Sequence, residues 1–230
     1  MSPPAALLFD LDGTLVDSAV TIAMALSELS TTRGGKPVDA AAVRRLVSKG
    51  APVLVREALG MLAGDSETDV ASFRAILAEL PPQPDIVFPG VVDALEALSA
   101  IGHPCAVVTN KPERLARLLV EQLGLNRFFG AVVGGDTLAV CKPDPAPLHH
   151  ALQALPEASA DNAIMIGDSD VDARAAAAAR LPFALFLGGY EPDRCAAVAV
   201  AVAFASFAEL PAALHRLMSE ERAPQVRATG

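Results

Sequence analysis

Two aspartates stand two positions apart at the end of an apolar run near the start of the chain. Asp10 and Asp12 follow the apolar residues 5–9 and precede Gly13. Side chains on an extended backbone repeat every second residue, so both carboxylates would project toward the same side. Two like charges held this close need a cation, a shared proton, or both. The plain alternative is that Asp12 and Gly13 only form a turn.

A hydroxyl, an amide and a lysine follow the next two apolar runs. Thr109 and Asn110 come directly after residues 105–108, where a helix is expected to begin, and such donors at a helix N-terminus favour an anion. Lys142 lies after residues 131–133, among prolines that restrict the backbone. A lysine there suits a phosphoryl group and keeps neighbouring carboxylates ionised. Taken singly, Thr109 has the alternative of a helix cap, and Lys142 that of a solvated loop residue.

Three acidic residues cluster after the apolar run 163–166. Asp170 and Asp172 would fall in the first turn of a helix, where acidic side chains offset the helix dipole. Asp168 comes directly after Gly167, too early for that role, and is therefore a candidate metal ligand. Because parallel strands end at one edge of a sheet, the polar groups that follow all four runs would meet there.

Alternating helices and apolar strands would carry these residues. Strands are expected over residues 5–9, 105–108, 131–133, 163–166, 183–187 and 197–203. Helices are expected over residues 91–100, 113–123, 147–154, 171–179 and 207–218. This alternation predicts an α/β fold with a doubly wound, mostly parallel, Rossmann-like sheet.

Residues 17–84 differ from the rest because they show helical periodicity and no strand signal. The first helix is expected over 20–29, with Asp17 and Ser18 as its caps. Glycine and proline breaks divide the remainder at 34–37, 49–52, 60–66 and 81–84. We predict a core from residues 1–16 and 85–219, an inserted helical domain at 17–84 and a flexible tail at 220–230.

Composition excludes several classes of function. A formal charge of −9 over 230 residues argues against nucleic acid as a partner, because a phosphate backbone requires a basic face. No apolar stretch reaches membrane-spanning length, and the opening Met-Ser-Pro-Pro lacks the basic start of a signal peptide. Cys105, Cys141 and Cys195 stand in no metal-ligand or redox spacing. We therefore expect a soluble cytoplasmic protein with no membrane partner.

These motifs, in this order, resemble those of the haloacid dehalogenase superfamily. The likeness rests on Asp-Leu-Asp-Gly-Thr-Leu at 10–15, an apolar run that ends in Thr109, Lys142, and Gly-Asp-Ser-x-x-Asp at 167–172. The stretches 108–112, 134–136 and 142–148 are most similar to bacterial phosphoglycolate phosphatases. The resemblance implies that the helical insertion is a cap domain. It also implies that the first and fourth strands lie side by side at the centre of the sheet.

The resemblance further implies roles for the carboxylates at the sheet edge. Asp10 would be the nucleophile that forms an aspartyl-phosphate, and Asp12 would be the general acid and base. Mg²⁺ would be bound by Asp10, by the backbone carbonyl of Asp12 and by Asp168. Asp172 would orient the waters around the ion or bind it directly.

The phosphate and substrate contacts implied by the resemblance come from other segments. Thr109, Asn110 and Lys142 would hold the phosphoryl oxygens, and Lys142 would also pair with Asp10. Lys49 and Gly50 lie between two predicted helices of the cap, which selects the substrate in this family. The lysine would suit a leaving group that bears a carboxylate. Three arginines flank this segment and have the alternative of a solvated helix face: Arg44, Arg45 and Arg56.

The resulting prediction is a Mg²⁺-dependent phosphatase, monomeric or homodimeric, that acts on a small phosphorylated metabolite. The first choice of substrate is 2-phosphoglycolate. Alternatives that stay open are a sugar phosphate such as N-acetylmuramic acid 6-phosphate, a nucleotide, and a phosphomutase reaction on the same fold. A dehalogenase is disfavoured because that reaction needs neither Asp12 nor a metal. A non-catalytic sensor is disfavoured because Asp10, Asp12, Lys142 and Asp168 are all present.

Overall fold

The computed structural model describes residues 4–81, 85–156 and 158–220, which contain a six-stranded sheet. The strands are β1 Ala6–Phe9, β2 Cys105–Val108, β3 Ala131–Val133, β4 Ala163–Gly167, β5 Phe183–Phe186 and β6 Val202–Phe204. They run in the order β3-β2-β1-β4-β5-β6, and each neighbouring pair is parallel. The predicted α/β fold is confirmed, and β1 and β4 are neighbours at the centre of the sheet.

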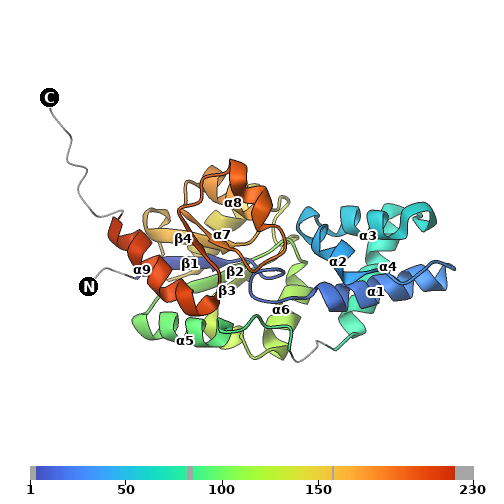
Figure 1. Ribbon diagram of the computed structural model, residues 1–230, viewed down its shortest axis with the longest axis horizontal. Helices are drawn as coiled ribbons and strands as arrows, with labels where there is room; N and C mark the ends of the chain where they lie inside the picture. Colours follow the sequence, from blue (N-terminus) through green and yellow to red (C-terminus); the bar gives the residue numbers. More distant parts are fainter. Residues whose placement is uncertain (1–3, 82–84, 157, 221–230) are drawn as a thin grey trace.

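Helices cover both faces of this sheet (Figure 1). On one face lie α5 Val91–Ile101, α6 Glu113–Gln122 and α9 Leu210–Glu220, and on the other lie α7 Ala146–Ala154 and α8 Asp170–Ala179. Strand β1 shows why both are needed. Leu7 and Phe9 belong to the first core, whereas Ala6 and Leu8 belong to the second. A strand buried on both sides is apolar without alternation, as the sequence of β1 is.

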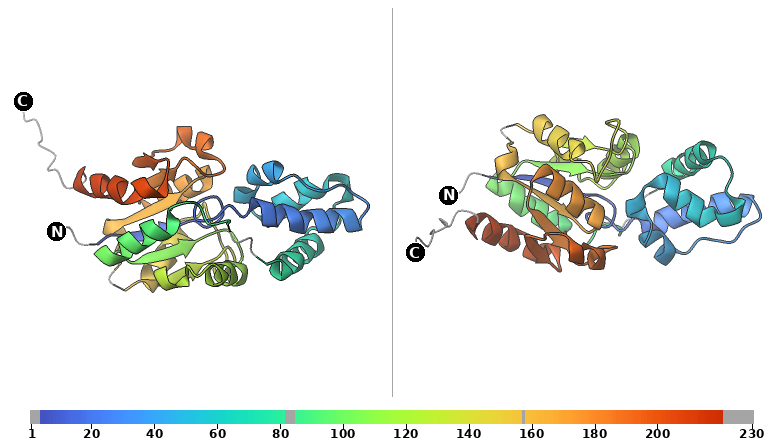
Figure 2. Two further views of the ribbon diagram at one scale, coloured as in Figure 1. Left: turned by 60° about the horizontal axis from the view of Figure 1, so that its bottom comes forward. Right: turned by 90° about the horizontal axis from the view of Figure 1, so that it is seen from above.

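Four helices from the first third of the chain pack around a core of their own. They are α1 Ala19–Thr32, α2 Ala40–Arg44, α3 Ala51–Leu59 and α4 Ser66–Glu79. Figures 1 and 2 show this group beyond one end of the sheet, joined to the rest of the chain at α1 and after α4. The limits of the predicted domains, at residues 16, 84 and 219, stay a prediction.

The expected strand at 197–203 is the largest error in the predicted elements. A 3-10 helix covers Pro192–Ala197, and the strand β6 is shorter and begins only at Val202. The stretch consists mainly of alanine and valine, so hydrophobicity alone could not mark where the strand begins. A smaller difference concerns α3, which starts inside the predicted break at 49–52. Pro52 lies in the first turn of that helix, where its missing N–H group removes no hydrogen bond.

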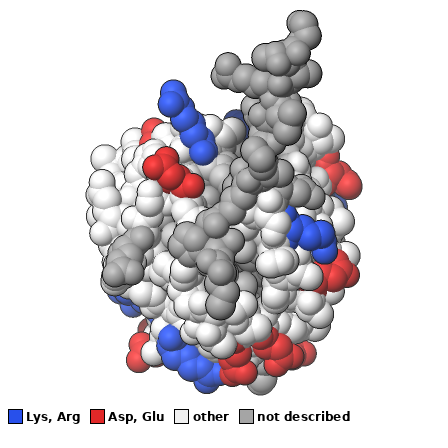
Figure 3. Space-filling model, turned by 90° about the vertical axis from the view of Figure 1, so that its left-hand side faces the viewer, with Lys and Arg blue, Asp and Glu red and all other residues white. Residues whose placement is uncertain are grey.

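Charges are sparse on the face turned away from α1–α4. Figure 3 shows single acidic and basic side chains interspersed among uncharged residues there. The described part of this face therefore offers a polyanion no concentrated positive charge. Within the described residues, the helices are all too short or too polar to span a lipid bilayer.

Candidate active site

Lys142 is the centre of a buried ion-pair cluster at the carboxyl end of β1 and β4. Its Nζ atom lies 2.9 Å from a carboxylate oxygen of Asp10 and 2.6 Å from one of Asp172. Only 2 % of the lysine side chain is exposed, so the two pairs are shielded from solvent. The Asn110 side-chain amide donates to the Lys142 carbonyl at 2.9 Å and fixes the loop that carries the lysine. The structure thus joins the ends of three strands through one cation.

Burial and charge determine the protonation of this cluster. Burial raises the pKa of Asp10 to about 7, and repulsion from Asp172 adds to this, against the attraction of Lys142. Burial also raises the pKa of Asp168 well above its usual range, with further repulsion from Asp172 and Asp10. For Lys142, burial acts to lower the pKa, but the carboxylates of Asp10 and Asp172 raise it above its ordinary value. The lysine alone therefore does not neutralise the carboxylates.

The residues that surround this uncompensated negative charge fit a divalent cation. Asp10, Asp168 and Asp172 each present a carboxylate oxygen, and the three oxygens lie within 4.8 Å of one another. Carboxylate oxygens are the ligands that Mg²⁺ prefers. Thr14 Oγ1 donates to Asp168 at 2.8 Å, and the Tyr190 backbone N–H donates at 2.7 Å, so the Asp168 carboxylate is held in place.

Asp172 has fewer free acceptor positions than the other two aspartates. One oxygen accepts from Lys142 at 2.6 Å, and the other accepts from the Ser169 hydroxyl at 2.6 Å and its backbone N–H at 3.2 Å. Ser169 and Asp172 form a capping box at the start of α8. These contacts favour the orienting role among the two predicted for Asp172. Direct metal binding by this residue stays a prediction.

The absence of a side chain at Gly13 leaves space for the carboxylate of Asp168. The backbone there has a φ of +90°, and a Cβ atom would lie 2.6 Å from an Asp168 oxygen and 2.8 Å from the Tyr190 ring. Gly34, after α1, has a φ of +78°, and a Cβ atom added to it would meet nothing within 4 Å. Both positions have a left-handed backbone conformation, which glycine adopts without strain, but only at Gly13 would a side chain also clash with its neighbours.

The Gly13→Ala variant is therefore expected to unfold more easily than Gly34→Ala. Both variants strain the backbone, so the difference in their free energies of unfolding measures the clash with Asp168, about 1–3 kcal/mol. Urea denaturation of both variants and the parent chain checks this expectation. Equal losses would contradict the tight contact between Gly13 and Asp168.

Lys111 contacts the candidate site but was not predicted from the sequence. Its Nζ atom lies 3.1 and 3.2 Å from the two carboxylate oxygens of Asp12, and both side chains are only 8 % exposed. The Ser18 hydroxyl donates to the same carboxylate at 2.5 Å. The available signal was the position of Lys111, one residue after Asn110 in the stretch that follows β2.

Ser18 occupies the predicted N-cap position of α1, but its side chain does not cap the helix. Ser18 makes no side-chain hydrogen bond to the start of α1, because its hydroxyl contacts Asp12 instead. Asp17 accepts from the Tyr190 hydroxyl at 2.8 Å and pairs with Arg44 at 2.7 Å. The segment that enters the helical group is therefore tied to Asp12 on one side and to the loop after β5 on the other.

A pocket opens directly over this cluster. Its lining residues come from both parts of the chain: Asp10, Asp12, Val47, Ser48, Thr109, Asn110, Lys111, Lys142, Ser169, Val171 and Asp172. Thr109, Asn110 and Lys142, the predicted phosphate-binding residues, thus meet the predicted nucleophile in one cavity. Val47 and Ser48 are the contributions of the helical group.

Lys49 lies apart from this pocket. Its side chain is exposed and is not among the residues that line this pocket, whereas Ser48 beside it lines the site. Gly50 lines an adjoining pocket, which also reaches Asp12. Arg45 and Arg56 are exposed as well. The roles predicted for Lys49 and Gly50 stay predictions.

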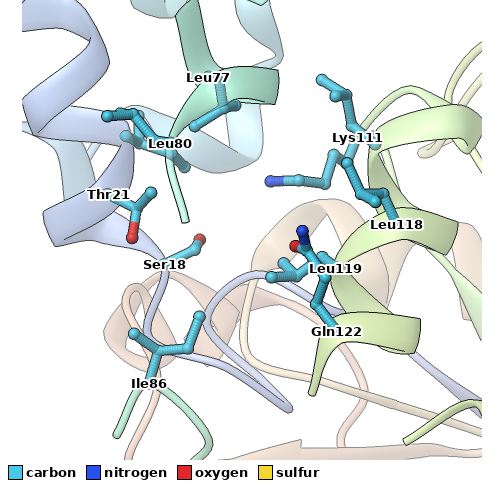
Figure 4. A pocket seen from close by; sticks show the side chains of 11 residues that line it. Ser18, Thr21, Leu77, Leu80, Ile86, Lys111, Leu118, Leu119 and Gln122 are labelled. Atoms are coloured by element: carbon cyan, nitrogen blue, oxygen red, sulfur yellow. The ribbon is translucent and has the colours of Figure 1, made fainter. Parts of the chain in front are cut away.

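An apolar pocket lies on the far side of Lys111 (Figure 4). Figure 4 shows Lys111 and Gln122 reaching toward Ser18 and Thr21 across it, with Leu77 of α4 and Leu80, which follows that helix, beside them. Leucine and isoleucine side chains make up most of its lining. Lys111 therefore stands at the junction of the described pockets around Asp12.

Comparison with known proteins identifies the family to which the chain belongs. The model of the haloacid dehalogenase-like hydrolases matches residues 4–180. The chain belongs to this family. The resemblance found in the sequence is confirmed, and the carboxylates and Lys142 of this haloacid dehalogenase-like hydrolase lie within the matched residues.

Relatives of this hydrolase share most of its length. A phosphoglycolate phosphatase of Rhodospirillum rubrum is 42% identical over 90% of this chain and 89% of the relative. A plasmid-encoded phosphoglycolate phosphatase of Cupriavidus necator is 39% identical over 92% and 94%. The crystal structure of a predicted phosphoglycolate phosphatase from Haemophilus somnus has a TM-score of 0.84 at 26% identity, and covers 92% of this chain and 98% of that one. This haloacid dehalogenase-like hydrolase is a phosphoric monoester hydrolase.

Proposed function

We propose that this hydrolase is a Mg²⁺-dependent phosphatase that converts 2-phosphoglycolate to glycolate and phosphate through an aspartyl-phosphate. The contact that carries the proposal is the 2.9 Å pair between Asp10 and Lys142 in the floor of the pocket. A carboxylate is a weak nucleophile toward a phosphate dianion, so the surrounding positive charge must lower the barrier. Lys142 lies where it would contact both the attacking carboxylate and the phosphoryl oxygens.

In the first step, a carboxylate oxygen of Asp10 attacks phosphorus, and the bond between phosphorus and the leaving oxygen breaks. The leaving alkoxide takes a proton from Asp12, whose carboxyl group lies in the same pocket. Lys142 and Thr109 bind the phosphoryl oxygens as charge develops on them. Lys111 and Ser18 hold the Asp12 carboxyl group in position.

In the second step, water attacks phosphorus and gives a proton to Asp12. The bond between phosphorus and Asp10 breaks, so phosphate is released and the Asp10 carboxylate is restored. Asp12 therefore acts first as an acid and then as a base, and both side chains finish in their starting states. Val47 and Ser48 cover the pocket from the helical group and would limit entry of other water molecules.

The metal-binding part of the proposal rests on Asp10 and Asp168, together with the predicted backbone carbonyl of Asp12. A bound Mg²⁺ would neutralise negative charge on the phosphoryl group. Asp172 accepts a hydrogen bond from Lys142 and would orient the groups around the ion without binding it. Thr14 keeps Asp168 directed toward Asp10.

Metal binding is expected to reverse the pH dependence of stability. The pKa of Asp10 is about 7 in the folded chain against 3.8 in the unfolded chain, so its contribution is present below 3.8 and lost as the pH rises to about 7. The metal-free chain should therefore lose stability across this range. Because Mg²⁺ binds deprotonated carboxylates, it should raise the Tm more at about pH 8 than at about pH 5.

Thermal unfolding with a chelator and with Mg²⁺ at both pH values checks this. Activity should vanish with the chelator and return with Mg²⁺. Equal shifts in Tm at the two pH values, or activity that survives thorough chelation, would contradict the metal site.

The choice of substrate is supported by the relatives and by the residues that line the site. Relatives at 36 to 42% identity carry the name phosphoglycolate phosphatase. The crystal structure of CbbY from Rhodobacter sphaeroides, which is in complex with phosphate, has a TM-score of 0.76 at 25% identity, and covers 90% of this chain and 96% of that one. The pocket over Asp10 is lined mainly by charged and polar side chains, which suits a small polar ester.

A panel of phosphate esters tests the substrate directly. Released phosphate is measured with 2-phosphoglycolate, N-acetylmuramic acid 6-phosphate, other sugar phosphates and mononucleotides. We expect the highest kcat/KM for 2-phosphoglycolate. A higher kcat/KM for another ester would assign that ester as the substrate in place of 2-phosphoglycolate. An isomerised ester without release of phosphate would indicate a phosphomutase.

We also propose a cytoplasmic location. Cys105, Cys141 and Cys195 are all free thiols. Unpaired cysteines are typical of a reducing compartment. Burial raises the pKa of both Cys105 and Cys195 to about 12, so these two thiols stay protonated.

A further inference from the structure

Arg74 is a cation of the helical group that has no partner among the described residues. It lies on α4, and its Nε atom is buried there without a hydrogen-bond partner. Within residues 4–81, 85–156 and 158–220, no ion pair involves Arg74 either. A buried donor left unpaired costs free energy, so such a group is rare unless something binds it. The position of Arg74 indicates what that partner would be.

Arg74 lines the pocket that adjoins the candidate active site. Asp12, Asn110 and Lys111 line the same pocket. The same three residues line the smaller pocket over Asp10, so the two cavities share a wall. A group that leaves phosphorus past Asp12 would enter the cavity that contains Arg74.

The charges in this second cavity are unequal. In the structure Lys111 pairs with Asp12 at 3.1 Å, whereas no carboxylate among the described lining residues pairs with Arg74. Apart from Asp12, Lys111 and Arg74, the lining residues are uncharged. Asn110 is polar, and most of the others are apolar: Ile22, Val47, Gly50, Ala51, Leu54, Phe73, Leu77, Pro112 and Leu115. The positive charge of Arg74 thus faces an apolar cavity, where an anion would be attracted more strongly than in water.

We propose that Arg74 binds the carboxylate of the substrate's leaving group and so selects esters whose leaving group is an acid. This inference rests on the proposed function, since it places the leaving group beyond Asp12. An arginine matches a carboxylate because its guanidinium group presents parallel N–H donors. The selective role predicted for Lys49, whose side chain is exposed, stays a separate prediction.

The experiment compares 2-phosphoglycolate with its neutral amide, which has nearly the same shape. The acid-to-amide ratio of kcat/KM values is measured for the parent chain and for Arg74→Gln. Loss of a hydrogen bond to a charged group lowers this ratio by about 10- to 100-fold. Arg74→Lys keeps the charge without the paired donors, and an intermediate ratio is expected.

A control variant separates recognition from general damage. Arg56→Gln changes an exposed arginine on α3 that lines neither cavity. It should keep the acid-to-amide ratio of the parent chain. A merely structural role for Arg74 would lower the values for acid and amide equally, and would leave the ratio unchanged.

Binding to the Asp10→Asn background separates this inference from the proposed reaction. Both compounds are titrated calorimetrically into Asp10→Asn and into Asp10→Asn/Arg74→Gln. If the parent chain does not hydrolyse 2-phosphoglycolate but binding still prefers the acid through Arg74, the substrate assignment fails and the role of Arg74 stands. If the preference for the acid is absent, or survives the loss of Arg74, the inference is overturned.

Discussion

The Asp10→Asn variant is expected to lose turnover by about 10⁴-fold or more, because removal of a nucleophile leaves only binding and charge stabilisation. The amide keeps the shape of the side chain but has no anionic oxygen to attack phosphorus. Since one buried carboxylate is removed from beside Asp168 and Asp172, the variant should fold at least as stably as the parent chain in the absence of metal. Steady-state release of phosphate and a denaturation curve measure both expectations.

Asp170→Asn is the matched control for this change. Asp170 lies in the first turn of α8, two residues before Asp172, and pairs with Arg174 at 3.1 Å on the surface. It lines none of the pockets around Asp10. The control should keep its kcat, whereas turnover by Asp10→Asn close to the parent value would remove the nucleophile assignment.

The Lys142→Met variant is expected to lose both turnover and stability. Methionine fills a similar volume but leaves Asp10 and Asp172 buried without their cation. Loss of one partner from a buried pair costs about 3–5 kcal/mol, and we expect a free energy of unfolding lower by this amount near neutral pH. Urea denaturation of the metal-free protein measures it.

The pH dependence of that loss identifies its cause. Protonation neutralises the remaining carboxylates, so the deficit of Lys142→Met relative to the parent chain should shrink as the pH falls from about 8 to about 5. Lys142→Met/Asp172→Asn should recover part of the stability at the higher pH. The control Lys49→Met changes an exposed lysine and should stay within about 0.5 kcal/mol of the parent chain. A constant deficit at both pH values would mean that lost packing, and not charge, explains it.

Much of the fold could be predicted from the sequence because each strand ends at a recognisable residue. The apolar run before Asp10 and the expected strand at 105–108 correspond to β1 and β2. The prediction that the first and fourth strands are neighbours came from the family resemblance, because apolar runs alone do not determine which strands pair. The stretch 197–203 failed because small apolar residues there have no periodicity that separates strand from loop.

The candidate site was predictable where the backbone positions a side chain, and less so where long side chains do. Asp10, Thr109 and Asp168 follow strand ends, so spacing alone placed them at one edge. Lys111 and Arg74 were missed because the reach of a flexible side chain depends on tertiary packing. Arg74 lies on a helix that only the folded chain brings against Asn110 and Asp12.

Covalent phosphorylation of Asp10 is the most direct test of the mechanism. The enzyme is mixed in excess with substrate and Mg²⁺, quenched in acid within a single turnover and reduced with borohydride, which converts an acyl phosphate at an aspartate to homoserine. Mass spectrometry of the peptide that contains residues 5–16 should find homoserine at position 10, and none in the Asp10→Asn control. Unmodified Asp10 during active turnover, or homoserine at another aspartate, would contradict the account.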